Sequence, residues 1–93
     1  MTKVTLRGYI VVPEADLHLV KSELVKHIAL TRAEKGCLTF EVIQSDTNPR
    51  QFSVYEEFTD KLSFGAHQAR VKQSRWGEVT VNVERHYKIT EES

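Results

Sequence analysis

The order of hydrophobic patterns along the chain constrains its fold more than any other feature of the sequence. Residues 3–12 alternate between apolar and polar side chains, which predicts a strand that Pro13 ends. Residues 14–34 repeat apolar side chains at spacings of three and four, which predicts an amphipathic helix. Gly36 is the expected C-cap of that helix. The first part of the chain therefore predicts a strand followed by a helix.

The remainder of the chain predicts a hairpin, a second helix and a last strand. Residues 37–45 and 52–58 both alternate, and the short polar segment between them has turn-forming residues, so the two strands are expected to pair. Thr59 is placed to cap a helix over residues 60–72. Residues 79–89 then alternate again, which predicts the last strand.

This order of elements, βαββαβ, is that of a ferredoxin-like α+β fold. Such a fold has one antiparallel sheet with two helices on one face. The length of 93 residues fits one domain, so residues 1–93 are expected to form it. The other sheet face would expose Tyr9, Val11, Ile43 and Tyr55, which a second copy of the chain could bury. We therefore expect a homodimer that packs sheet against sheet.

Composition argues against several classes of function. The 13 basic and 13 acidic residues balance, which is untypical of a nucleic-acid-binding protein. No apolar run is long enough for a signal peptide or a membrane span, so we expect a cytoplasmic protein. Cys37 is the only cysteine, and no histidines have a metal-ligand spacing, so no metal site is expected. No cofactor-binding motif is present, and no cofactor is expected.

A carboxylate and a histidine are the candidate catalytic residues. Glu56 shares a strand face with Val54 and Phe58, so it is expected to lie beneath the helices, where burial raises a carboxyl pKa. His67 is expected on the covering helix, facing Glu56. One hypothesis makes His67 a general base that Glu56 orients. The other makes the pair a buried hydrogen bond that fixes the helix on the sheet, and the sequence leaves both open.

Three aromatic residues are predicted to bind substrate. Trp76 follows the second helix and could form a wall of an aromatic pocket, although a lone Trp also fits a core or an interface. Phe64, on the helix beside His67, and Phe40, on the second strand, are the other two. His27 is interpreted as a solvated or interfacial residue beside the apolar stripe of the first helix.

Two segments, EKGCLTFEV and PRQFSVYEEFTDKLSFGAH, resemble the antibiotic biosynthesis monooxygenase domain family. The most specific pieces are the run from Gly36 to Leu38 and the pair Tyr55 and Glu56 followed by His67. The resemblance implies a dimeric α/β barrel. Haem-degrading members of this family have a Trp where this chain has Phe58, so the resemblance favours the quinol-monooxygenase and isomerase branches instead.

The leading functional prediction is a small cofactor-independent monooxygenase, which oxidises a phenolic, quinol or polyketide-like aromatic with dioxygen. His67 and Glu56 would be its catalytic residues. An alternative is an isomerase of a small phosphorylated signalling sugar. It would need a phosphate site, for which the nearby basic residues are Lys61, Arg70, Lys72 and Arg75. A third reading is a ligand-binding dimer without catalysis.

Overall fold

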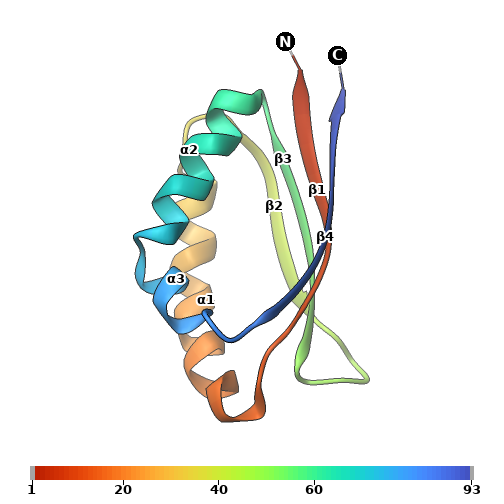
Figure 1. The fold of residues 1–93 in the computed structure, drawn as a ribbon, viewed down its shortest axis with the longest axis vertical. Coiled ribbons are helices and arrows are strands. Elements are labelled where there is room, and N and C mark those ends of the chain that lie inside the picture. Colours follow the sequence, from red (N-terminus) through yellow and green to blue (C-terminus); the bar gives the residue numbers. More distant parts are fainter. Residues whose placement is uncertain (1, 93) are drawn as a thin grey trace.

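The fold combines a four-stranded antiparallel sheet with helices on one of its faces (Figure 1). The computed structural model describes residues 2–92; Met1 and Ser93, which the single-domain prediction includes, lie outside the described residues. The elements in chain order are β1 (Lys3–Val11), η1 (Glu14–Asp16), α1 (Leu17–Arg32), β2 (Cys37–Gln44), β3 (Gln51–Phe58), α2 (Lys61–Lys72), α3 (Arg75–Val79) and β4 (Glu84–Glu92).

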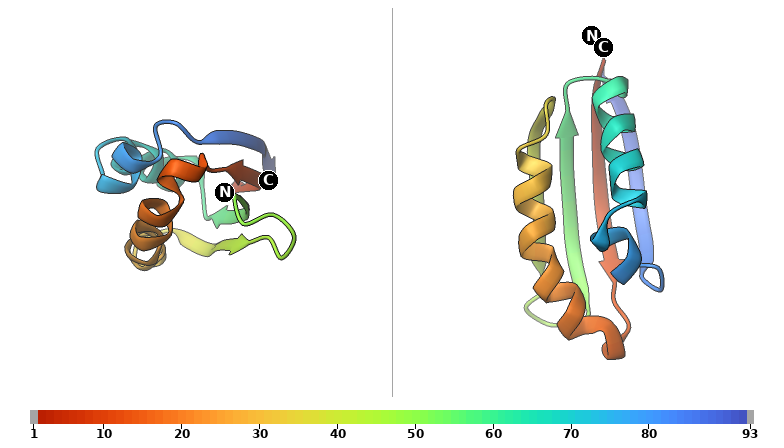
Figure 2. Two further views of the ribbon diagram at one scale, coloured as in Figure 1. Left: turned by 90° about the horizontal axis from the view of Figure 1, so that it is seen from below. Right: turned by 90° about the vertical axis from the view of Figure 1, so that its left-hand side faces the viewer.

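The strand order in the sheet is β2-β3-β1-β4, and every neighbouring pair is antiparallel. Helix α1 contacts β2, whereas α2 contacts β1 and β3, so the two long helices cover adjacent parts of one sheet face (Figure 2). The predicted ferredoxin-like α+β fold is therefore confirmed, including the placement of both helices on one face.

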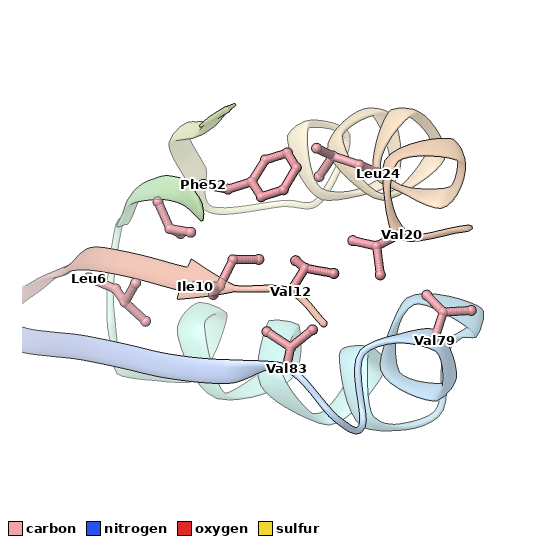
Figure 3. Close-up of a cluster of buried hydrophobic side chains, with 9 residues drawn as sticks. Leu6, Ile10, Val12, Val20, Leu24, Phe52, Val79 and Val83 are labelled. Atoms are coloured by element: carbon pink, nitrogen blue, oxygen red, sulfur yellow. The ribbon is translucent and has the colours of Figure 1, made fainter. Parts of the chain in front are cut away.

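A cluster of buried hydrophobic side chains lies between the sheet and the helices, towards the end of the sheet where α1 begins. Figure 3 shows that side chains from β1, β3 and α1 meet those of α3 and of the segment before β4. The buried cluster consists of Leu6, Ile10, Val12, Val20, Leu24, Phe52, Val54, Val79 and Val83.

The last strand begins later than the sequence pattern predicts. Residues 75–79 form the short helix α3, and β4 starts only at Glu84. Ser74 caps α3 by accepting a hydrogen bond from the Gly77 backbone N–H at 3.2 Å. Val79 and Val83 are both buried, and their spacing of four fits a helical period as well as a strand alternation, which is why the pattern misled.

Two predicted helix caps are also wrong in detail. Asp60, rather than Thr59, caps α2 by accepting a hydrogen bond from the Ser63 backbone N–H at 2.8 Å. Gly36 does not cap α1, which ends at Arg32. It has a φ of +92°, and a Cβ at this position would overlap the Ser63 side chain. Gly36 thus allows the chain entering β2 to pass close to the start of α2.

Candidate active site

Glu56 lies on β3 and points towards the helices. It is only 6% exposed. Burial, together with the negative charge of Glu34, raises its pKa from 4.5 to about 7. Its Oε1 atom has no hydrogen-bond partner among the described residues. A buried polar atom without a partner is costly, so this carboxyl group is destabilising unless a ligand or water engages it.

His67 comes from α2, on the opposite wall, and is 3% exposed. Its Nε2 atom lies 3.7 Å from Glu56 Oε1. The structure therefore brings the two predicted catalytic residues together, although 3.7 Å exceeds hydrogen-bond distance. Burial lowers the pKa of His67, and the neighbouring Glu34 carboxylate opposes that effect.

Glu34, which the sequence pattern did not reveal, makes the hydrogen bond to His67 that was predicted for Glu56. Glu34 lies between α1 and β2, and its Oε1 atom is 2.7 Å from His67 Nδ1. Its Oε2 atom accepts a hydrogen bond from Arg70 Nε at 2.6 Å. Burial would raise the pKa of Glu34, but these hydrogen bonds outweigh it and hold the pKa below its usual value. Glu34 therefore carries a negative charge at neutral pH, beside Nδ1 of His67.

Trp76 and His27 form an aromatic wall beside the pair. Their rings stack with centroids 4.6 Å apart, and Phe40 meets His27 edge-on at 5.4 Å. His27 is 4% exposed, so its interpretation as solvated or interfacial was wrong. Burial and the positive charges of His67 and Arg70 lower the pKa of His27 to about 3, so it is a neutral imidazole.

A cleft of about 240 Å³ opens between α2 and the sheet, and the candidate pair lines it. Drug-sized ligands usually occupy roughly 300–1,000 Å³, so this cleft suits a smaller molecule. A cavity of about 30 Å³ shares some of its lining and includes Phe40. The residues whose chemistry matters most in the cleft are Glu56, His67, His27, Trp76, Arg85 and Tyr87.

The other aromatic predictions have different outcomes. Phe40 is buried, with its ring centroid 5.9 Å from that of His67. Phe64 packs against Phe58 at 5.7 Å instead of lining the cleft. Tyr87 and Arg85, which the sequence analysis did not select, reach the cleft from β4. The alternating pattern of the last strand put both on one face, but nothing in the sequence showed that this face borders the pair.

Metal-binding clusters and membrane-spanning helices are two further features to consider among the described residues 2–92. No group of three or more His, Cys, Asp or Glu side chains within this range is placed to hold a metal ion. None of the helices in the same range is long and apolar enough to cross a membrane.

Solved structures similar to this chain share its fold. An antibiotic biosynthesis monooxygenase is 18% identical, with a TM-score of 0.76 over 100% of this chain and 97% of the other. A conserved protein of unknown function from Bacteroides thetaiotaomicron, described as a possible oxidoreductase, is 17% identical, with a TM-score of 0.76 over 97% of both chains. A protein from Pseudomonas aeruginosa is 21% identical, with a TM-score of 0.72 over 98% of this chain and 92% of the other.

The sequence comparisons complete this result. No match was found among curated proteins. The family model described as antibiotic biosynthesis monooxygenase matches residues 4–79, which run from β1 to the end of α3 and include Glu34, Glu56 and His67. The chain therefore belongs to the antibiotic biosynthesis monooxygenase family.

Proposed function

We propose that this protein is a cofactor-independent monooxygenase that oxidises a small phenolic, quinol or polyketide-like aromatic with dioxygen. The observation that carries the proposal is the buried pair of Glu56 and His67, with Nε2 and Oε1 3.7 Å apart, lining a small cleft beside Trp76. A pair with perturbed pKa values in a cleft is typical of acid–base sites. The family assignment supports oxygen chemistry at this site.

The chemistry needs only groups that the cleft supplies. His67 Nε2 accepts the proton of a substrate hydroxyl group, and the resulting phenolate is electron-rich enough to pass an electron to dioxygen. In the overall reaction a hydroquinone and dioxygen give a hydroxyquinone and water. One oxygen atom enters the ring, the other leaves as water, and the substrate provides all the electrons. Leu6, Val71 and Trp76 give the cleft an apolar part, against which the ring of an aromatic substrate can pack.

Menadiol, a two-ring hydroquinone, provides the test. Spontaneous oxidation of menadiol gives menadione and hydrogen peroxide, so oxygen uptake alone is insufficient. With ¹⁸O₂, we expect the protein to produce a hydroxyquinone that carries one ¹⁸O atom, together with labelled water, faster than a protein-free control. Production of unlabelled menadione and ¹⁸O-labelled peroxide at the control rate, with no hydroxyquinone, would contradict the proposal for this substrate class.

The rival functions give different results in the same assay. An isomerase consumes no oxygen, and a ligand-binding dimer binds an aromatic without forming product. Two of the four basic residues considered for the isomerase's phosphate site are already paired with carboxylates: Arg70 with Glu34 at 2.6 Å and Lys61 with Glu91 at 2.9 Å.

We also propose that two copies of the chain pack through the sheet face opposite the helices. That face carries Tyr9 and Ile43, which are 37% and 61% exposed, together with Val11 and Tyr55. Exposed apolar side chains gathered on one sheet face favour burial against a partner.

The dimer prediction can be tested with one charged substitution. Ile43→Glu would place a carboxylate in the interface, so we expect this variant to sediment as a monomer under conditions where the wild type sediments as a dimer. Leu62→Glu is the matched control, because Leu62 is 86% exposed on α2 and away from that face. A monomeric wild type, or a dimer that Ile43→Glu leaves intact, would refute this mode of assembly.

A further inference from the structure

Both carboxylate oxygens of Glu34 form hydrogen bonds with side chains of α2. Oε1 lies 2.7 Å from His67 Nδ1, and Oε2 lies 2.6 Å from Arg70 Nε. His67 and Arg70 are three residues apart on the helix, so their side chains share a face and can reach one carboxylate. Arg70 is held in turn, because its Nη2 atom donates to Thr31 Oγ1 at 3.1 Å. The four side chains form one connected network between α1 and α2.

The charge of Glu34 decides where the proton of neutral His67 lies. An ionised carboxylate only accepts hydrogen bonds, so the nitrogen 2.7 Å from it must carry a hydrogen. The lone pair of the neutral ring is then on Nε2. That atom faces Glu56 and the cleft, at 3.7 Å from Oε1. A lone pair on Nε2 can accept a proton from a molecule in the cleft. A lone pair on Nδ1 could not, because the Glu34 carboxylate occupies that side of the ring.

We propose that Glu34 is a positioning residue, which fixes the tautomer of His67 so that Nε2 is the proton-accepting atom in the cleft, and that Arg70 holds Glu34 in place. Glu34 does not line the cleft, so it acts through His67 and does not touch the substrate. The role in turnover rests on the proposed function, whereas the role in fixing the tautomer does not.

Three other features fit this assignment. Glu34 is outside both helices, so no helical or strand pattern requires a carboxylate there. The hydrogen bonds from Arg70 and His67 hold its pKa low, which keeps it an acceptor at neutral pH. Glu56 cannot replace it, because Glu56 lies on the Nε2 side of the ring, beyond hydrogen-bond distance.

Histidine ¹⁵N NMR tests the tautomer directly and needs no substrate. Long-range ¹H–¹⁵N correlations distinguish the Nδ1–H and Nε2–H forms of His67. In the wild type at neutral pH, we expect the neutral ring to be the Nδ1–H form. In Glu34→Gln the amide can either donate or accept, so we expect a substantial Nε2–H fraction. We also expect turnover of menadiol to fall by at least roughly 10-fold to 100-fold with KM unchanged, the range found for outer-shell groups that orient the imidazole ligands of metal sites.

Glu23→Gln is the matched control. Glu23 is also a partly buried carboxylate near an arginine, with its Oε1 atom 3.8 Å from Arg75 Nε, but it does not contact His67. This variant should keep the wild-type tautomer and turnover. If Glu34→Gln keeps the pure Nδ1–H form, or if Glu23→Gln changes the tautomer as much, the positioning role is wrong.

Arg70→Gln is a second variant, in case Glu34→Gln does not fold. The titratable and charged groups that face His67 are Glu34, Arg70, Glu56 and His27. Loss of the guanidinium removes the hydrogen bond that holds Glu34 Oε2, so we expect the neutral His67 ring to show a larger Nε2–H fraction than in the wild type. A neutral ring that stays entirely in the Nδ1–H form would contradict the role given to Arg70.

The two proposals can fail separately. A wild type that forms ¹⁸O-labelled hydroxyquinone from menadiol, with a tautomer that does not depend on Glu34, would overturn the positioning role alone. A tautomer that depends on Glu34, in a protein that forms no labelled hydroxyquinone above the protein-free control, would support the positioning role and overturn the monooxygenase function for this substrate class.

Discussion

Replacing His67 with alanine is expected to lower the rate of hydroxyquinone formation from menadiol by roughly 10²–10⁴-fold, the usual contribution of a general base. Two other titratable groups that line the cleft, His27 and Tyr87, are not suited to the task. Burial lowers the pKa of His27 to about 3, which makes it a very weak base, and raises that of Tyr87 to about 12, which keeps it a neutral phenol. The measurement is the initial rate of ¹⁸O incorporation under saturating substrate.

Two controls separate a lost base from a lost fold. His67→Ala leaves a cavity beside Phe58 and Phe40, so its unfolding free energy must be measured alongside the rate. His67→Gln fills more of the space without restoring a base, and should be equally slow. His18→Ala removes an exposed histidine from α1 and should react at the wild-type rate. An unchanged rate in folded His67→Ala would show that His67 is not the base.

The first three strands and the first long helix were predictable because each has a hydrophobic period long enough to be unambiguous. The alternation of β1 and the hairpin of β2 and β3 gave the sheet, and the apolar stripe of α1 gave one layer of the core. The pattern failed where two periods coincide. Val79 and Val83 suit both a strand and a helical turn, and the Ser74 cap, together with packing of Val79 in the core, selects the helix.

Only those site residues whose neighbours along the strand or helix indicate a buried face could be predicted from the sequence. Glu56 could be placed because its strand neighbours are apolar, and His67 because it lies on the helix that directly follows the strand, 11 residues after Glu56. Glu34 is 33 residues from His67, and its position depends on how the segment after α1 passes the start of α2, through Gly36. Long-range pairings of this kind leave no periodic signal in a single sequence. His27 was missed because it flanks the apolar stripe, and the aromatic contacts that bury it come from α3 and β2.

Replacing Glu56 with glutamine is expected to stabilise the protein at alkaline pH, by up to roughly 3 kcal/mol at pH 8. In the folded protein the pKa of Glu56 is about 7, against 4.5 in an unfolded chain. The folded state thus keeps a proton that the unfolded state releases above pH 4.5. Stability is greatest below that pH and falls as the pH rises through 7, and one pKa unit corresponds to about 1.4 kcal/mol. Glutamine cannot ionise, so the free energy of unfolding of the variant does not fall in this way as the pH rises.

Urea denaturation at pH 4 and pH 8 measures the effect, and the neighbouring residue provides the control. The two proteins should differ little at pH 4 and most at pH 8. Glu57 lies on the opposite sheet face, where hydrogen bonds from Tyr55, Thr39 and Lys3 lower its pKa, so Glu57→Gln should not show a gain that grows with pH. If Glu56 served mainly to fix α2 on the sheet, Glu56→Gln would instead be destabilising at both pH values. A variant that is more stable and slower at pH 8 would show that the buried carboxyl group costs stability and is retained for its chemistry.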